Sequence, residues 1–66
     1  MAKTNPLKRY RIELHSEEGR FKGAAEFSVT GWTEDQVLDE AERMIRSVAT
    51  PSSGDTLEIV KETELA

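Results

Sequence analysis

The sequence of 66 residues contains no cysteine and a single histidine. Disulfide bonds are therefore excluded, and a structural zinc site, which takes four Cys or His ligands, has no basis. Chains this short have small cores and often depend on a disulfide, a metal ion or a partner subunit. With disulfides and zinc set aside, the sequence predicts one domain that is either well packed or oligomeric.

Long apolar runs are also missing. No stretch reaches the ~18 consecutive apolar residues that a membrane-spanning helix needs. The opening MAKTNPLKRYR is basic but no apolar stretch follows it, so it lacks the pattern of a secretory signal. We therefore expect a cytoplasmic protein.

Acidic residues outnumber basic ones. The chain has 13 Asp and Glu against 9 Lys and Arg, a net charge of −4, which disfavours a nucleic acid as partner. The N-terminal arm, residues 1–6, and the residues after it carry the opposite sign, with Lys3, Lys8, Arg9 and Arg11 and no acid. Such an arm could contact nucleic acid, although spread charges also simply solubilise a terminus.

Two alternating patterns predict a β-hairpin. From Leu7 onward, apolar and polar residues alternate with Tyr10, Ile12 and Leu14 on the inner face and Arg9, Arg11, Glu13 and His15 on the outer face. After a turn at residues 16–19, where Gly19 supplies the left-handed conformation, a second strand runs from Arg20 to Thr30. Its glycine, Gly23, marks a bulge or a close approach, by a packed helix, the Tyr10 ring or a partner strand.

A helix follows the hairpin. Thr33 is an N-cap and Gln36 completes a capping box, while Trp32 and Val37 have the spacing of a hydrophobic staple. One apolar stripe recurs with helical spacing, formed by Val37, Leu38, Ala41, Met44, Ile45 and Val48. Pro51 ends the helix by about Ala49.

A last strand is predicted from Thr56 to about Thr63, with Leu57 and Ile59 inward and Glu58, Val60 and Glu62 outward. The fold class is therefore α+β, a two-layer β-β-α-β domain over residues 7–63 with a frayed C-terminus at 64–66. We expect a three-stranded antiparallel sheet of order 2-1-3 with the helix on one face. The predicted core comprises Tyr10, Ile12, Leu14, Phe21, Ala25, Phe27, Val29, Val37, Leu38, Ala41, Met44, Ile45, Val48, Leu57 and Ile59.

Catalytic chemistry has no support in the sequence. His15 stands alone on a polar face, without an identifiable nucleophile or second ligand. The carboxylates lie in a turn and along an exposed helix, where no pocket would shift their pKa values. No glycine-rich loop precedes a helix. We therefore expect no enzyme, no catalytic residue, no metal and no cofactor.

Three surfaces remain as candidates for binding a protein partner or a second copy. The open sheet face carries Arg9, Arg11, Glu13, Lys22, Glu26, Glu58, Val60 and Glu62, which could equally form cross-strand ion pairs. The outer edge of the second strand, with Ala24 and Ser28, is protected only by Lys22 and Glu26 and could accept a further strand. The acidic helix back carries Glu34, Asp35, Asp39, Glu40 and Glu42. Trp32 is either a staple residue or an exposed anchor.

The order of elements resembles that of compact bacteriophage proteins that bind and inhibit host enzymes. The likeness covers most of the chain but rests on no motif, and the last strand here is acidic around Lys61. The HicB-type antitoxins share the strand-turn-strand-helix opening, without the proline-containing segment expected before the helix. The leading hypothesis is a small non-catalytic protein-interaction module. The alternatives are a bacteriophage-type inhibitor with an acidic, nucleic-acid-mimicking surface and a nucleic-acid accessory protein that uses the basic arm.

Overall fold

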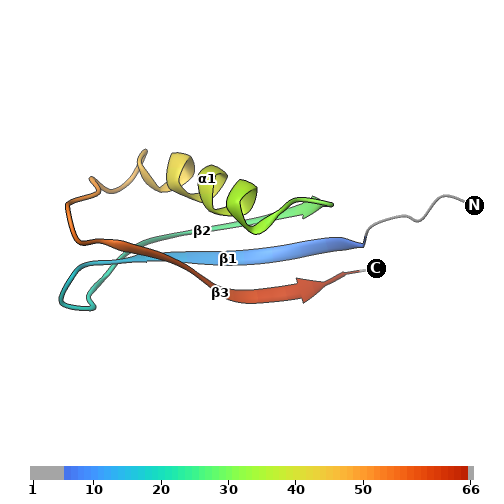
Figure 1. The fold of residues 1–66 in the computed structure, drawn as a ribbon, viewed down its shortest axis with the longest axis horizontal. Coiled ribbons are helices and arrows are strands. Elements are labelled where there is room, and N and C mark those ends of the chain that lie inside the picture. Colours follow the sequence, from blue (N-terminus) through green and yellow to red (C-terminus); the bar gives the residue numbers. More distant parts are fainter. Residues whose placement is uncertain (1–5, 66) are drawn as a thin grey trace, which may run out of the picture.

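Three strands and one helix form two layers in the computed structural model, which describes residues 6–65 (Figure 1). The elements are β1 (Leu7–His15), β2 (Phe21–Thr30), α1 (Glu34–Ile45) and β3 (Thr56–Glu64). The sheet has the order β2-β1-β3 with both pairings antiparallel, and α1 covers one face. The predicted fold class and strand order are confirmed. The predictions for residues 1–5 and 66 lie outside the described residues.

The turn between β1 and β2 depends on a glycine. Gly19 has a φ of 88°, in the left-handed region that favours glycine, and its N–H donates to the Ser16 carbonyl at 2.8 Å. Ser16 in turn donates its N–H to the Arg20 carbonyl at 2.8 Å. The hairpin loop therefore forms as predicted, and it fixes where β1 and β2 begin to pair.

A β-bulge changes the start of β2. Leu14 pairs with Gly23 but the next residue, His15, pairs with Phe21, so Lys22 is an extra residue in β2. Phe21 consequently lies on the same face as His15, with the two rings edge to face and 5.9 Å between their centroids. The side chain of Phe21 is 57% exposed, so its predicted place in the core was wrong.

A second bulge interrupts β3. Ile12 pairs with Ile59 while Arg11 pairs with Lys61, which leaves Val60 as the extra residue. Beyond the bulge, Glu62 pairs with Tyr10 and therefore lies on the helix-covered side, where an outward position had been predicted. Lys61 takes the outward position instead. β3 continues through Glu64, and Leu65 donates its N–H to the Leu7 carbonyl at 2.8 Å.

The start of α1 has the predicted capping box. The Gln36 N–H donates to Thr33 Oγ1 at 3.3 Å, and the Thr33 N–H donates to Gln36 Oε1 at 2.8 Å. The regular helix ends at Ile45, and the chain then turns through residues 46–49, with the N–H of Ala49 on the Ile45 carbonyl. Met44 inside α1 and Val48 beyond its end are 39% and 77% exposed, so their predicted places in the core were wrong.

The core lies between α1 and the middle of the sheet. Its buried side chains are Tyr10, Ile12, Leu14, Ala25, Val37, Ala41 and Ile45, of which Ile12, Val37 and Ile45 are the largest that are fully buried. A Cβ atom added at Gly23 would stand 3.3 Å from Ile45 Cγ2 and 3.7 Å from Ala49 Cβ. Of the three explanations for the small residue, the close approach of the helix is the one observed. β3 contributes no fully buried residue, since Leu57 and Ile59 are half-buried.

Candidate functional site

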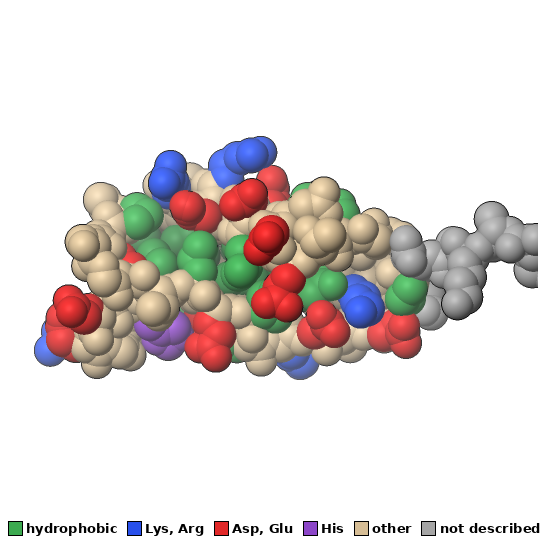
Figure 2. Space-filling view, in the orientation of Figure 1, with side chains coloured by type: hydrophobic (Ala, Val, Ile, Leu, Met, Phe, Trp, Pro, Cys, Tyr) green, Lys and Arg blue, Asp and Glu red, His purple; other side chains and the backbone are tan. Residues whose placement is uncertain are grey.

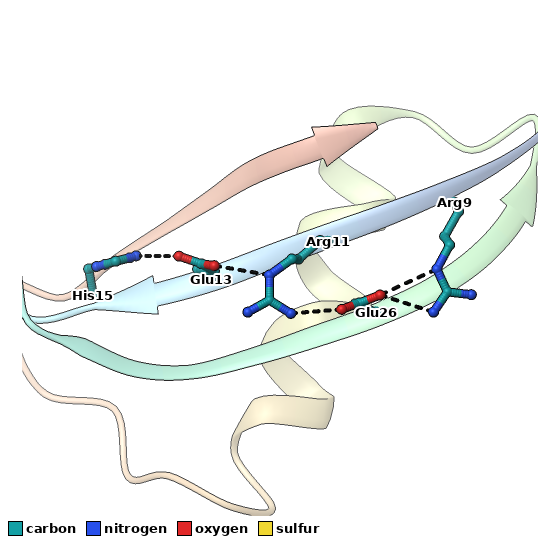
Figure 3. Close-up of polar contacts among 5 residues, drawn as sticks. All are labelled: Arg9, Arg11, Glu13, His15 and Glu26. Carbon is teal, nitrogen blue, oxygen red and sulfur yellow. Dashed lines mark hydrogen bonds and ion pairs between the residues drawn. The ribbon is translucent and has the colours of Figure 1, made fainter. Parts of the chain in front are cut away.

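The open face of the sheet carries a continuous chain of ion pairs along β1 (Figure 3). Arg9 donates to Glu26 Oε1 at 2.9 Å, and Arg11 donates to the other oxygen of the same carboxylate at 2.7 Å. Arg11 also donates to Glu13 at 3.0 Å, and Glu13 lies 2.8 Å from His15 Nε2. We call these five residues the charge ladder.

The charge ladder shifts the pKa values of its members. The hydrogen bond that His15 donates to the Glu13 carboxylate, helped by the contact with the Gly19 carbonyl, raises the pKa of His15 above its ordinary value. The hydrogen bonds of Arg9 and Arg11 lower the pKa of the Glu26 carboxyl, and those of His15 and Arg11 lower that of Glu13. Every one of these shifts favours the charged form, as expected for alternating charges that pair within β1 and, at Glu26, across to β2.

The charge ladder also accounts for most of the basic surface predicted near the N-terminus. Lys8 adds an ion pair with Glu62 at 3.6 Å on the helix-covered side. Of the four basic residues considered for nucleic-acid binding, Lys8, Arg9 and Arg11 are therefore paired with carboxylates. The fourth, Lys3, lies outside the described residues. Paired cations offer less charge to phosphates, so the arm loses much of its support as a nucleic-acid surface.

Lys22 does not lie with the charge ladder, where the sequence placed it. At the bulge, its Nζ reaches the loop between α1 and β3, with Asp55 Oδ2 at 2.6 Å and the Thr50 carbonyl at 3.0 Å. Asp55 also accepts the Ser52 N–H at 2.6 Å, and its side chain is only 6% exposed. The contact of Lys22 and Asp55 therefore holds this loop against β2, which is a structural role.

The direction of the backbone groups at the β2 edge follows from the hydrogen bond between the Leu65 N–H and the Leu7 carbonyl. Leu7 directs its groups toward β3, and neighbouring residues of a strand direct theirs to opposite sides. Even-numbered residues of β1 therefore bond toward β2. Their partners in β2 bond inward, which leaves the N–H and C=O groups directed outward at Ala24, Glu26 and Ser28.

The two edges of the sheet differ in their protection. β2 pairs regularly with β1 from Gly23 to Thr30, and Glu26 is its only charge there, drawn toward β1 by two arginines. β3 has a bulge at Val60, and its charged residues are Glu58, Lys61, Glu62 and Glu64. Bulges and charges are the devices that block strand addition. Among residues 6–65, no strand pairs with the outer side of β2.

The remaining predicted binding residues are dispersed. Ala24 and Ser28 lie beside the charge ladder, opposite Glu13 and Arg9, whereas Val60 is the bulged residue of the far edge strand. Trp32 is 37% exposed, with its ring 6.0 Å from that of Phe27. Trp32 is therefore partly covered by Phe27 and partly exposed, so it matches neither the buried staple residue nor the fully exposed anchor that the sequence offered as alternatives.

The sequence analysis did not predict that the side chains of Phe21 and Lys61 lie on the open sheet face. It also did not predict that Asp55 holds its loop against β2 through Lys22. The signal at Gly23 pointed to a bulge, but alternation alone does not tell which neighbour becomes the extra residue. Asp55 in a polar loop gave no signal of its partner, because Lys22 is distant in sequence. Each of these positions depends on pairing between elements.

Residues 6–65 provide no group of three or more His, Cys, Asp and Glu side chains that could hold a metal ion. In the same part of the chain, no helix has the length and apolar character to cross a membrane. Comparison of the chain with protein-family models, curated proteins and solved structures finds no match. The geometry of the surfaces is therefore the basis for a functional proposal.

Proposed function

We propose that the protein is a small non-catalytic protein-interaction module whose β2 edge accepts a further β-strand. The observation that carries the proposal is the run of outward backbone groups at Ala24, Glu26 and Ser28, without a bulge or a free charge to block it. The predicted cytoplasmic setting belongs to the same proposal and is tested by cell fractionation.

A second copy of the chain is the simplest occupant of this edge. Antiparallel pairing of two β2 strands about a two-fold axis would join the sheets into one of six strands, with both helices on the same face. Such pairing would bring two charge ladders onto one continuous open face. It would also add apolar contact to a chain whose own core is small.

Proline at Ala24 tests the proposal. It removes an outward N–H while leaving the bonds between β1 and β2 in place, so we expect the Ala24→Pro variant to be monomeric where the wild type is dimeric. Glu62→Pro is the matched control, because residue 62 directs its N–H outward at the other edge. Light scattering at two protein concentrations gives the mass, and circular dichroism confirms that the helix persists.

Charge reversal at Lys22 is not a useful test, because it would break the contact with Asp55 and disturb the loop. A wild-type monomer at both concentrations would exclude self-association through β2. A dimer that survives Ala24→Pro would show that another surface joins the copies. Rapid hydrogen exchange at the Ala24 and Ser28 amides in the wild-type dimer would contradict the proposal in a second, independent way.

A further inference from the structure

A groove runs between α1 and β3, on the side where the helix covers the sheet least completely. Two hollows of about 170 and 420 Å³ lie along it and share Leu57 as a lining residue. The apolar side chains that line them are Leu14, Leu38, Ile45, Pro51, Leu57 and Ile59. Figure 2 shows hydrophobic side chains in this region with acidic side chains around them. We call it the α1–β3 groove.

The charges on the α1–β3 groove are of one sign. Glu34 and Glu42 stand on the helix side, and Glu62 stands on the strand side beyond the bulge. No Lys or Arg is among the described residues that line either hollow. Glu42 and Glu62 each contact one cation, Arg46 at 3.3 Å and Lys8 at 3.6 Å, whereas Glu34 makes no ion pair among residues 6–65.

Backbone groups of β3 border the same groove. Ile12 and Leu14 bond toward β2, so their partners Ile59 and Leu57 direct their N–H and C=O groups away from β1. The bulge at Val60 limits regular pairing along this edge, and the acidic residues repel a like-charged strand but attract a basic one. A short basic segment could therefore bond to the groups of Leu57 and Ile59 and place alternate side chains in the groove. A second copy of β3 would bring like charges together there, because Glu58, Glu62 and Glu64 outnumber Lys61.

From the apolar floor, the acidic rim and the free strand groups, we propose that the α1–β3 groove binds an extended basic segment of a partner protein. Apolar side chains on one side of that segment enter between Leu38 and Leu57. Lys or Arg residues flanking them contact Glu34 and Glu62. This site is separate from the β2 edge, and it does not depend on the function proposed for that edge.

The test uses a synthetic peptide of alternating leucine and lysine with blocked termini, titrated into ¹⁵N-labelled protein. We expect amide shifts at Leu38, Leu57 and Ile59, and a Kd that rises with salt concentration. Peptides with glutamate in place of lysine, or serine in place of leucine, should bind far more weakly. Shifts confined to Ala24–Ser28, equal binding of either control peptide, or no binding at millimolar peptide would overturn the proposal.

Paired variants separate the groove from general acidity. Glu34→Gln combined with Glu62→Gln should weaken binding roughly two- to twenty-five-fold, since each exposed ion pair contributes a factor of about 1.4 to 5. Asp35→Asn combined with Glu18→Gln removes the same charge, including one acid from the first turn of α1, but at residues that do not line the groove. Equal weakening by both double variants would show that only net charge matters and would contradict the groove site.

Discussion

Asp55 is an almost enclosed carboxylate on a small protein, held by the Lys22 ammonium and the Ser52 N–H at 2.6 Å each. The hydrogen bond from Lys22, followed by that of Ser52, lowers the pKa of the Asp55 carboxyl below its ordinary value. The ionised form is thus favoured by folding. Replacing Lys22 or Asp55 by a neutral residue would leave the charge of the remaining one unpaired next to the loop.

A pH-dependent stability measurement follows from this contact. Because the folded pKa of Asp55 is lowered, its stabilisation is present above the unfolded value of about 3.9 and is lost as pH falls through the folded value. We expect Asp55→Asn to lower the melting temperature at pH 7, and the difference from wild type to narrow below about pH 4.

Asp39→Asn supplies the control, since Asp39 is exposed on α1 and makes no ion pair among residues 6–65. Thermal melts of the two variants and the wild type across the acid range give the comparison. A loss of stability in Asp55→Asn that stays constant from pH 7 to pH 2 would mean that charge is not the source of the effect.

The contact between α1 and β2 depends on the absence of a side chain at Gly23. A Cβ there would be 3.3 Å from Ile45 Cγ2, which is close but leaves room for a small shift of Ile45. Larger side chains would separate the helix from the strand. The neighbouring Ala24 lies opposite Glu13 on the open face, where no helix approaches.

We therefore expect Gly23→Val to destabilise the protein by about 1–3 kcal/mol through overpacking against α1. Ala24→Val is the matched substitution on the other face and should be neutral or slightly stabilising, because valine suits a strand. Urea denaturation followed by circular dichroism measures both. If the two valine variants were equally stable, α1 would not pack closely against β2 at Gly23.

The elements themselves were predictable because each has a local cause. Period-two alternation predicted β1 and β2, the Thr33–Gln36 capping box predicted the start of α1, and Gly19 predicted the turn. The side of the sheet on which Phe21, Lys22 and Glu62 lie was not predictable from the sequence. It follows from the two β-bulges, and their positions depend on how the strands pair. The end of α1 at Ile45, ahead of the apolar Val48, also reflects how the chain returns to β3.

The candidate site was predictable only in part, for the same reason. Arg9, Arg11, Glu13 and Glu26 share a face by alternation alone, and they do meet in the charge ladder. The α1–β3 groove could not be foreseen, because it depends on how far the helix reaches across the sheet. Helix placement is set by packing at Gly23 and Ile45. The sequence marked Gly23 as a point of close approach, but it left open which element approaches and did not identify Ile45 as the contact.

As a whole, the molecule is elongated. The principal extents are 48 × 17 × 16 Å and the Cα radius of gyration is 13.2 Å, whereas a compact domain of this length has a radius of about 10–11 Å. Strands of 9 or 10 residues in a sheet only three wide contribute to this shape, with the hairpin loop extending beyond them. The elongated shape matters for measuring the oligomeric state, because an elongated chain has a larger hydrodynamic radius than a compact chain of the same mass.

We expect the monomeric Ala24→Pro variant to elute from a sizing column ahead of a globular standard of equal mass. Light scattering should nevertheless report the mass of one chain, 7.4 kDa. An elution position matching a compact standard would contradict the elongated shape. Elution volume alone would therefore overestimate the mass of the monomer.

The two bulges have a consequence for how the chain could vary in length. Val60 and Lys22 are extra residues in their strands. The residues before and after each of them would alternate between the two faces of the sheet in the same way if it were absent. Deleting Val60 would shorten β3 yet leave Leu57, Ile59, Lys61 and Glu62 on their present faces. Deleting a residue elsewhere in the strand would exchange inner and outer side chains. Gaps in an alignment of related chains should therefore fall at residue 60 rather than beside it.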